Sequence, residues 1–233
     1  MRRTRVVDDP AVVTAEQIAA TADAGGQIVL AGGATPRAAY ELAAELDADW
    51  SRATLWFGDE RCVAPDDERS NFAMVKAALL DRLAGSAPTV MRIEGERGPD
   101  AAANAYEDRL NEAFDGGEPR FDLILLGLGP DLHTASLFPG KPAVEERERW
   151  VVGVAEAGME PYVPRVTLTL PALNAGREVV FLIAGEAKAD AVARAFGRDP
   201  QPDAPASLVA PHSGTVTLLL DSAAASQLEG VRA

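Results

Sequence analysis

The sequence predicts an α/β fold of three layers, in which helices cover both faces of a mainly parallel, Rossmann-like sheet. Short apolar segments alternate with amphipathic ones along the 233 residues, an order typical of repeated strand–helix units. Residues 121–126, Phe-Asp-Leu-Ile-Leu-Leu, are apolar almost throughout, as suits a strand buried on both faces. With 47% hydrophobic and 25% charged residues, the composition is that of a globular protein.

The first predicted strand covers residues 27–31, and a helix is predicted over 36–46, with Pro36 in its first turn. A second strand is predicted at 53–58. Apolar side chains recur at helical spacing over 71–83, which predicts a second helix there.

The rest of the chain continues this alternation. The remaining predicted elements are, in chain order, a strand at 89–93, a helix at 100–114, strands at 121–126, 165–170 and 178–184, a helix at 186–197, a strand at 215–220 and a short terminal helix. No internal repeat is visible, so we expect one domain over residues 1–233.

Charge and cysteine content exclude several classes of function. With 22 Lys and Arg against 36 Asp and Glu, the net charge of −14 argues against a nucleic-acid partner, which calls for a basic face. The single cysteine, Cys62, excludes an intramolecular disulfide. No apolar run approaches the roughly 20 residues of a membrane helix, and no hydrophobic signal segment follows the N-terminus. We therefore expect a cytoplasmic protein without a membrane partner, a monomer or a weak homodimer.

Ligands of parallel sheets bind beyond the carboxyl ends of the strands. The first of these ends carries Gly32-Gly33-Ala34-Thr35-Pro36. The glycines let the backbone approach a ligand closely, and Thr35 is placed to cap the helix that Pro36 opens. Free N–H groups at this helix start would attract a phosphate, although an ordinary strand–helix turn is an equal alternative. No Gly-Lys-Ser/Thr follows, so the turn is not a P-loop.

The second strand end carries three charges in a row, Asp59, Glu60 and Arg61. Such a run is usually a solvated loop, but a second polar cluster follows at 67–71, and its last two residues can cap the predicted helix. We expect Cys62 to be a passive neighbour rather than a nucleophile, since no His adjoins it in sequence.

The third strand end, after residue 126, only approaches a dinucleotide fingerprint. Gly127 and Gly129 fit, but Leu132 stands where the third glycine belongs, so we reject that interpretation. Asp131 precedes His133 by two residues, a spacing that lets both side chains lie on one side of an extended loop. A carboxylate beside an imidazole suits a general base, which we favour over a surface histidine in a capped turn.

Two cations stand near the remaining strand ends. Arg165 opens one strand and Lys188 lies just inside a helix. In so acidic a chain both are candidate anion ligands, although the residues alone favour solvent-exposed charges. His212 lies in a loop before the last strand and is expected to be structural.

Together these segments resemble the bacterial 6-phosphogluconolactonase family, part of a larger group with glucosamine-6-phosphate deaminases and ribose-5-phosphate isomerases. The resemblance covers about residues 10–226. Five blocks carry it, in this order: Gly-Gly-Ala-Thr-Pro, Gly-Asp-Glu-Arg with Ser70-Asn71 after it, Asp-Leu-His-Thr-Ala-Ser-Leu-Phe-Pro-Gly, Arg-Val-Thr-Leu-Thr-Leu-Pro-Ala-Leu, and Pro205-Ala206-Ser207.

The resemblance implies hydrolysis of 6-phosphoglucono-1,5-lactone, a sugar-phosphate lactone, to 6-phosphogluconate. His133 would be the general base that activates water, and Asp131 would orient it. Asp59 and Arg61 would line the pocket and position the lactone or its oxyanion. The residues that the resemblance assigns to the phosphate are Gly32, Gly33, Ala34, Thr35, Arg165 and Lys188. No cofactor is required, and the two histidines and one cysteine form no metal-ligand motif.

Two residues depart from the family pattern Gly-Glu-Asp-Gly-His. Pro130 replaces the Glu and Leu132 replaces the Gly. Because Pro130 narrows the local backbone choices, we expect both changes to belong to a shifted loop in which Leu132 has an ordinary conformation.

Two other functions remain as alternatives. A deaminase or isomerase of the same group would carry an Asn-Glu pair after the histidine, where this chain has Leu137 and Phe138. Phenylalanine transfers no proton, which disfavours that reading. A sugar-phosphate-binding module without turnover is the alternative outside enzymology.

Overall fold

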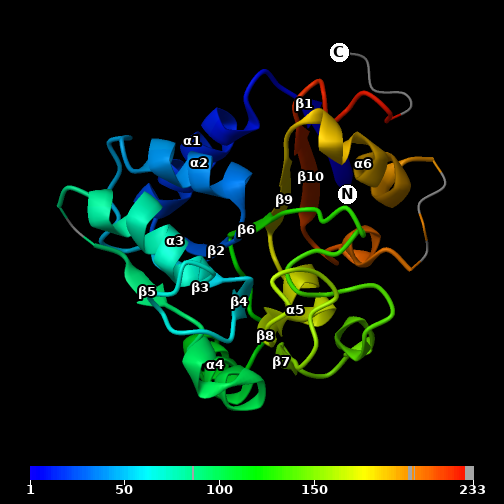
Figure 1. Ribbon diagram of the computed structural model, residues 1–233. Coiled ribbons are helices and arrows are strands. Elements are labelled where there is room, and N and C mark those ends of the chain that lie inside the picture. The colour runs from blue at the N-terminus through cyan, green and yellow to red at the C-terminus, as the bar shows by residue number, and fades with distance from the viewer. Residues whose placement is uncertain (86, 199–200, 202, 229–233) are drawn as a thin grey trace.

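A computed structural model describes residues 1–85, 87–198, 201 and 203–228. Its main sheet is parallel throughout and has seven strands (Figure 1). From edge to edge the strands are β1 (Arg2–Val6), β10 (Thr215–Leu220), β9 (Glu178–Ile183), β6 (Leu123–Leu126), β2 (Gln27–Leu30), β3 (Thr54–Phe57) and β5 (Thr89–Met91). The predicted mainly parallel sheet is confirmed.

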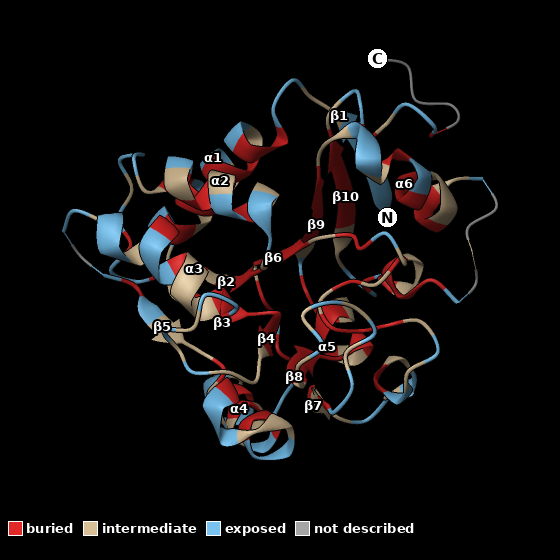
Figure 2. Ribbon diagram, in the orientation of Figure 1, coloured by how far each residue is buried: buried red, intermediate tan, exposed pale blue. Residues whose placement is uncertain are grey.

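Helices cover both faces of this sheet, which makes the predicted three layers. The helices are α1 (Pro10–Asp23), α2 (Ala34–Ala43), α3 (Asn71–Ala78), α4 (Pro99–Ala113), α5 (Leu170–Asn174) and α6 (Ala189–Phe196). The first three lie together on one side and α6 on the other (Figure 1). The core lies between the layers, and all four residues of β6 are buried, as a central parallel strand requires (Figure 2).

A second, smaller sheet lies beside the first and is antiparallel. Its order is β4 (Asp59–Arg61), β8 (Arg165–Leu168) and β7 (Val151–Val154). The strand predicted at 165–170 therefore belongs to this sheet, and it is shorter than expected. It ends because Thr169 caps α5 through its side chain, and α5 begins at the next residue.

Several predicted helix boundaries were wrong. The first predicted helix begins two residues earlier, at Ala34, with Gly33 as its N-cap, so Thr35 lies inside the helix and does not cap it. The helix predicted over 71–83 ends at Ala78 and continues as a 3₁₀ turn at Leu80–Arg82. The predicted cap Ser70 is confirmed, since its side chain accepts a hydrogen bond from Ala73 N.

Other elements were missed or differ. The strands β1, β4 and β7 and the helices α1 and α5 were not predicted, and residues 222–227 form turns where a short terminal helix was expected. Further 3₁₀ turns lie at Gly95–Arg97, Pro142–Glu145, Glu186–Lys188 and Pro205–Leu208.

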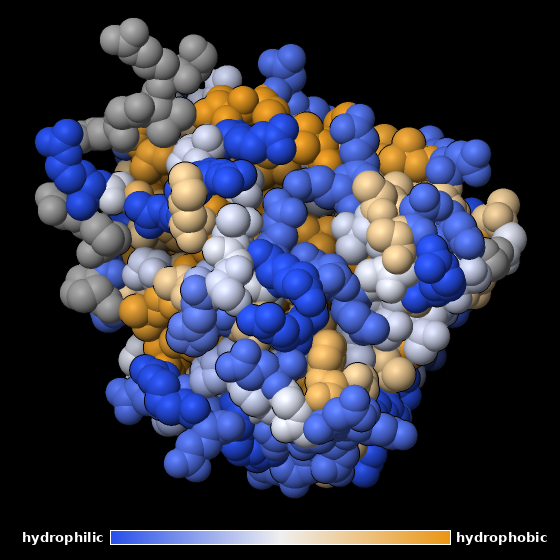
Figure 3. Space-filling view, turned by 180° about the vertical axis from the view of Figure 1, so that it is seen from behind, coloured by the Kyte–Doolittle hydropathy of each residue, from blue (hydrophilic) through white to orange (hydrophobic). Residues whose placement is uncertain are grey.

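One face of the molecule shows an uneven distribution of polar and apolar side chains. Seen from behind, hydrophilic side chains cover most of the lower half, and apolar ones show mainly in the upper half (Figure 3). Within the described residues, no helix is both long enough and apolar enough to cross a membrane.

Candidate active site

A cavity of about 400 Å³ lies at the carboxyl ends of β2, β6 and β9. The chain proceeds from β2 toward β3 on one side and later from β6 toward β9 on the other, so β2 and β6 flank the point where the strand order reverses. Open α/β sheets bind their ligands at such a point. The small sheet adds side chains from β4 and β8.

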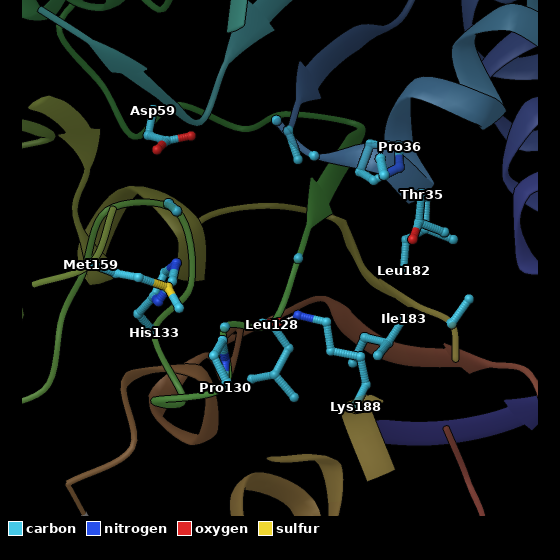
Figure 4. Close-up of a pocket in the computed structure, with 18 of the residues that line it drawn as sticks. Thr35, Pro36, Asp59, Leu128, Pro130, His133, Met159, Leu182, Ile183 and Lys188 are labelled. Carbon is cyan, nitrogen blue, oxygen red and sulfur yellow. Dashed lines mark hydrogen bonds between the residues drawn. The ribbon is translucent and has the colours of Figure 1, made fainter. Parts of the chain in front are cut away.

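The structure brings the predicted site residues together. All of them except Asp131 line the cavity, and Asp131 contacts one that does, His133. Those lining it are Gly32, Gly33, Ala34, Thr35, Asp59, Arg61, His133, Arg165 and Lys188. Figure 4 shows two ends: Thr35, Ile183 and Lys188 on one side, and Asp59, Met159 and His133 on the other.

His133 follows a tight turn after β6. Gly129 N donates to His133 O at 2.9 Å, and Leu132 N donates to Gly129 O at 3.0 Å. Inside this turn the Asp131 carboxylate contacts Nδ1 of His133. A carboxylate at Nδ1 favours the tautomer with its proton there, which leaves Nε2 able to accept another. Burial raises the pKa of Asp131, but the hydrogen bonds from His133 outweigh it and hold the pKa below its ordinary value.

The expectation of a shifted loop was wrong. Leu132 has a φ of 72°, in the left-handed region. Pro130 is the second residue of the Gly129–Leu132 turn, a position where its fixed φ fits common turn types, so it does not displace the loop. The Leu132 side chain is buried in the core.

The segment after His133 connects this turn to the small sheet. Ala135 also has a positive φ, of 49°, inside a turn closed by Leu137 N and Thr134 O at 2.9 Å. This turn directs Ser136 toward β4, where its hydroxyl donates to Asp59 Oδ2 at 2.6 Å.

Asp59 is a buried carboxylate held by two hydrogen-bond donors and flanked by an arginine. Besides Ser136, Asn71 Nδ2 donates to Asp59 Oδ1 at 3.0 Å. Arg165 Nη1 lies 4.0 Å from Asp59 Oδ2. Asp59 is therefore fixed in place at the cavity wall, next to the two cavity-lining arginines.

Glu60 is a structural residue of the site that sequence reasoning missed. Its buried carboxylate accepts hydrogen bonds from the backbone N–H of Arg61 and Asn71, both at 2.7 Å, and of Phe72 at 2.8 Å, and from Ser70 Oγ at 3.0 Å. It thus binds the start of α3 to β4. Burial raises the pKa of Glu60, and these donors offset part of the rise. The available sequence signal for this role was the position of Glu60 in a charged run at a strand end, with the helix-capping residue Ser70 following ten residues later.

The other end of the cavity suits an anion. The N-cap Gly33 has a φ of 113° and provides no side-chain cap, so the first N–H groups of α2 have no side-chain acceptor at the cap. Gly32 packs directly on Asn71, and a Cβ at residue 32 would overlap its side chain. Lys188 Nζ donates to Leu128 O at 2.6 Å. Burial lowers the pKa of Lys188, while the charge of Asp131 opposes that change.

Arg165 is 3% exposed and has both structural contacts and a free donor. Its Nη2 donates to Met159 O at 3.2 Å and to Pro161 O at 3.0 Å, which ties down the 159–161 segment at the cavity wall. Burial lowers its pKa, and the Asp59 charge opposes the change. Arg61 donates through Nη1 to Arg69 O at 2.6 Å. The Nε–H groups of both arginines are buried without a partner.

Phe138 packs against His133, with ring centroids 4.7 Å apart. The guanidinium of Arg165 lies 5.7 Å from the same ring. Phe138 therefore contacts both His133 and Arg165, through a ring–ring contact with the first and a cation–π contact with the second.

The remaining chemically reactive residues lie outside this arrangement. Burial raises the pKa of Cys62 to about 11, so it is a poor nucleophile. His212 is exposed and does not line the cavity. Among the described residues, no three His, Cys, Asp or Glu side chains gather as a metal-binding group.

Comparisons with known proteins agree with this geometry. The sequence profile described as "Glucosamine-6-phosphate isomerases/6-phosphogluconolactonase" matches residues 3–218. The chain is 42% identical over 182 residues to a Homo sapiens 6-phosphogluconolactonase, covering 78% of this chain and 70% of that one. It is 44% identical over 189 residues to the Streptomyces coelicolor 6-phosphogluconolactonase, covering 77% and 72%. The crystal structure of 6-phosphogluconolactonase from Leishmania guyanensis matches with a TM-score of 0.85 and 30% identity, covering 100% of both chains.

Proposed function

We propose that His133 is the general base of a lactone hydrolase, because this chain belongs to the family of glucosamine-6-phosphate isomerases and 6-phosphogluconolactonases. The enzyme hydrolyses 6-phospho-D-glucono-1,5-lactone to 6-phosphogluconate, a step of the oxidative pentose phosphate pathway. Relatives named 6-phosphogluconolactonase, 42% and 44% identical over more than three quarters of the chain, support this reaction. The observation that carries the role of His133 is the Asp131–His133 contact at the cavity wall.

The reaction needs a base that takes a proton from the attacking water and an acid that gives a proton to the leaving ring oxygen. Nε2 of His133 takes a proton from water as the water oxygen attacks the lactone carbonyl carbon. The carbonyl π electrons move to oxygen and form a tetrahedral oxyanion. When this intermediate collapses, the bond to the ring oxygen breaks, and His133 returns its proton to that oxygen. One imidazole therefore serves both steps, while Asp131 holds the ring in place through its contact with Nδ1.

Two further residues would act at the end of the cavity where His133 activates water, which we call the reacting end. The Arg61 side chain lines the cavity, and its free Nε–H supports the proposal that it positions the lactone or the oxyanion. Asp59 has lone pairs beyond those used by Ser136 and Asn71, and these can accept a substrate hydroxyl.

The phosphate is assigned to the opposite end of the cavity. The N–H groups at the start of α2, which has no side-chain cap, suit phosphate oxygens, and Lys188 adds a positive charge. Arg165 lies beside Asp59, with its Nη1 4.0 Å from Asp59 Oδ2, and would add a second positive charge and a free Nε–H from that side of the cavity, while its Nη2 holds the 159–161 segment. Both sheets supply residues to this one cavity, which supports the proposal that the chain acts as one domain.

The structure favours hydrolysis over the alternatives. The positions at which a deaminase would carry its Asn-Glu pair are Leu137 and Phe138, both buried, and Phe138 packs on the His133 ring. A module that only binds sugar phosphates would not need the Asp131–His133 contact.

The test is loss of 6-phosphogluconolactone in the presence of the purified protein, corrected for its spontaneous hydrolysis. We expect turnover at nanomolar protein, with 6-phosphogluconate as product and none from glucosamine 6-phosphate. Saturable binding of the phosphorylated sugar without turnover would support the binding module instead. We also propose that the protein is cytoplasmic, which suits the free thiol of Cys62. We propose further that it is a monomer or a weak homodimer.

A further inference from the structure

The turn before His133 contains a residue that combines an unfavourable backbone with a buried side chain. Leu132 has a φ of 72° and is 1% exposed. The left-handed region is strained for a residue with a Cβ. Such strain persists only where the surroundings over-determine the conformation, and it tends to occur at functional sites.

The hydrogen bonds of the turn show what the left-handed residue does. The bonds from Leu132 N to Gly129 O and from Gly129 N to His133 O close a three-residue loop over Pro130, Asp131 and Leu132. In loops of this kind the last residue is left-handed, which lets the two flanking residues pair. Leu132 therefore supplies the chain reversal that brings the His133 ring onto the Asp131 carboxylate.

Leu132 is also bound to a distant part of the chain. Its carbonyl accepts a hydrogen bond from Ala206 N at 3.3 Å, and Ala206 is fully buried in the 3₁₀ turn Pro205–Leu208. The next residue, His133, lines the cavity. The Leu132 side chain and carbonyl thus anchor the turn in the core, one residue away from the proposed base.

We propose that Leu132 is a positioning residue for the hydrolysis, whose buried side chain holds the left-handed turn that sets His133 against Asp131. Glycine at residue 132 would adopt this backbone without strain but would provide no side-chain anchor, and only its carbonyl could still accept from Ala206 N. Alanine would keep the strain and lose most of the anchor. This inference rests on the proposed role of His133 as the base.

Three substitutions separate the anchor from the strain. Leu132→Ala should lower kcat at least about tenfold and Leu132→Gly about three- to tenfold, because the base loses its orientation. Leu132→Met, which keeps most of the buried volume, should stay within about threefold of the native kcat. KM for the phosphorylated lactone should change less than about threefold in all of them, since the phosphate end is untouched.

The matched control is Leu218→Ala. Leu218 is a buried leucine on β10, a strand that contributes nothing to the cavity lining among the described residues. This variant loses the same atoms from the core and should lower the melting temperature while kcat stays within about twofold of the native value.

A second readout does not depend on activity. The proton shared by Asp131 and His133 Nδ1 should give a downfield proton resonance in the NMR spectrum, assigned by its loss in Asp131→Asn. We expect it to weaken or vanish in Leu132→Ala and Leu132→Gly and to persist in Leu132→Met and Leu218→Ala. If Leu132→Ala does not fold, Leu132→Gly, which relieves the strain, carries the test.

The proposal is overturned if a folded Leu132→Ala or Leu132→Gly keeps native kcat and an unchanged resonance. It is also overturned if Leu132→Gly is both faster and more stable than the native protein, because Leu132 would then be a strained defect. Absence of lactonase activity in the native protein would instead contradict the proposed function, and the resonance would still report whether Leu132 positions His133.

Discussion

The Asp131 carboxylate contacts Nδ1 of His133 across a turn in which only Leu132 separates the two residues. The contact places a carboxylate behind the imidazole and leaves the other ring nitrogen for the cavity that His133 lines. Because the two residues are so close in sequence, the local backbone determines the geometry of their contact. Small changes in this turn should therefore alter the rate of hydrolysis more than the stability of the fold.

Replacing the proposed base should remove activity and leave the fold intact. We expect His133→Ala to lower the hydrolysis rate at least about a hundredfold, the low end for a general base. The His133 side chain is 18% exposed and lies in a loop, so the melting temperature should change little. Lactone consumption, corrected for the spontaneous reaction, and thermal unfolding are the measurements. Full activity in the folded variant would disprove the assignment.

The carboxylate behind the base should also contribute to stability in a pH-dependent way. The pKa of Asp131 is lowered in the folded protein, because the hydrogen bonds from His133 outweigh the effect of burial. Its stabilisation is therefore present above the unfolded value of about 3.9 and is lost as the pH falls through the lower folded value. The free energy of unfolding should be higher in the native protein than in Asp131→Asn at pH 5, and the difference should shrink below about pH 4.

That prediction is checked by urea unfolding of both proteins at several pH values. A difference that grows as the pH falls from 5 to 3 would contradict it. Asp131→Asn should also lower kcat. An amide can either donate to Nδ1 or accept from it, so it no longer selects the tautomer that carries its proton on Nδ1.

A single methyl group beside the pair should disturb it. A Cβ at residue 129 would overlap Nδ1 of His133 and lie 2.6 Å from Asp131 Oδ1. We expect Gly129→Ala to lower kcat more than about tenfold, because the pair must move out of its catalytic geometry. Gly58→Ala is the control, since a Cβ there meets Val29 and Leu30 at ordinary distances of 3.5 and 3.6 Å. Equal effects of the two substitutions on kcat would refute the prediction.

The phosphate end can be tested by comparing two substrates. Lys188→Met keeps the side-chain length and removes the charge, so binding of the phosphorylated lactone should weaken by about 1.5–3 kcal/mol, or about ten- to a hundredfold in KM. Hydrolysis of unphosphorylated gluconolactone should barely change. Equal losses on both lactones would show that Lys188 supports the fold through its bond to Leu128 rather than binding phosphate.

Arg165→Met should behave differently. Its Nη2 also ties down Met159 and Pro161, so we expect losses on both lactones, with the larger loss on the phosphorylated one. Steady-state kinetics on both substrates measures the two effects. An unchanged rate with unphosphorylated lactone would mean that the bonds to the 159–161 segment do not matter for the reacting end.

The sequence by itself determined the order of the main strands and helices and most of the site. Strands such as β6 and β9 were predictable because burial on both faces requires an uninterrupted apolar run, which is a local property. The Gly32–Thr35 turn and the Asp131–His133 pair were predictable because parallel strands end at one edge, and the loops that follow those ends gather there. Arg165 and Lys188 were assigned to the site only through the family resemblance, since the residues alone favoured solvent-exposed charges.

Tertiary structure alone decided the rest. The strand at Arg165 belongs to an antiparallel sheet because it pairs with Asp59–Arg61, more than a hundred residues away, and no local pattern encodes that partner. Glu60 looked like one charge in a solvated run, yet it binds the start of α3 because the fold brings the two together. Leu132 looked unsuited to a left-handed backbone. It adopts one because the closed turn requires it and the burial of its side chain, which only the folded core provides, offsets the strain.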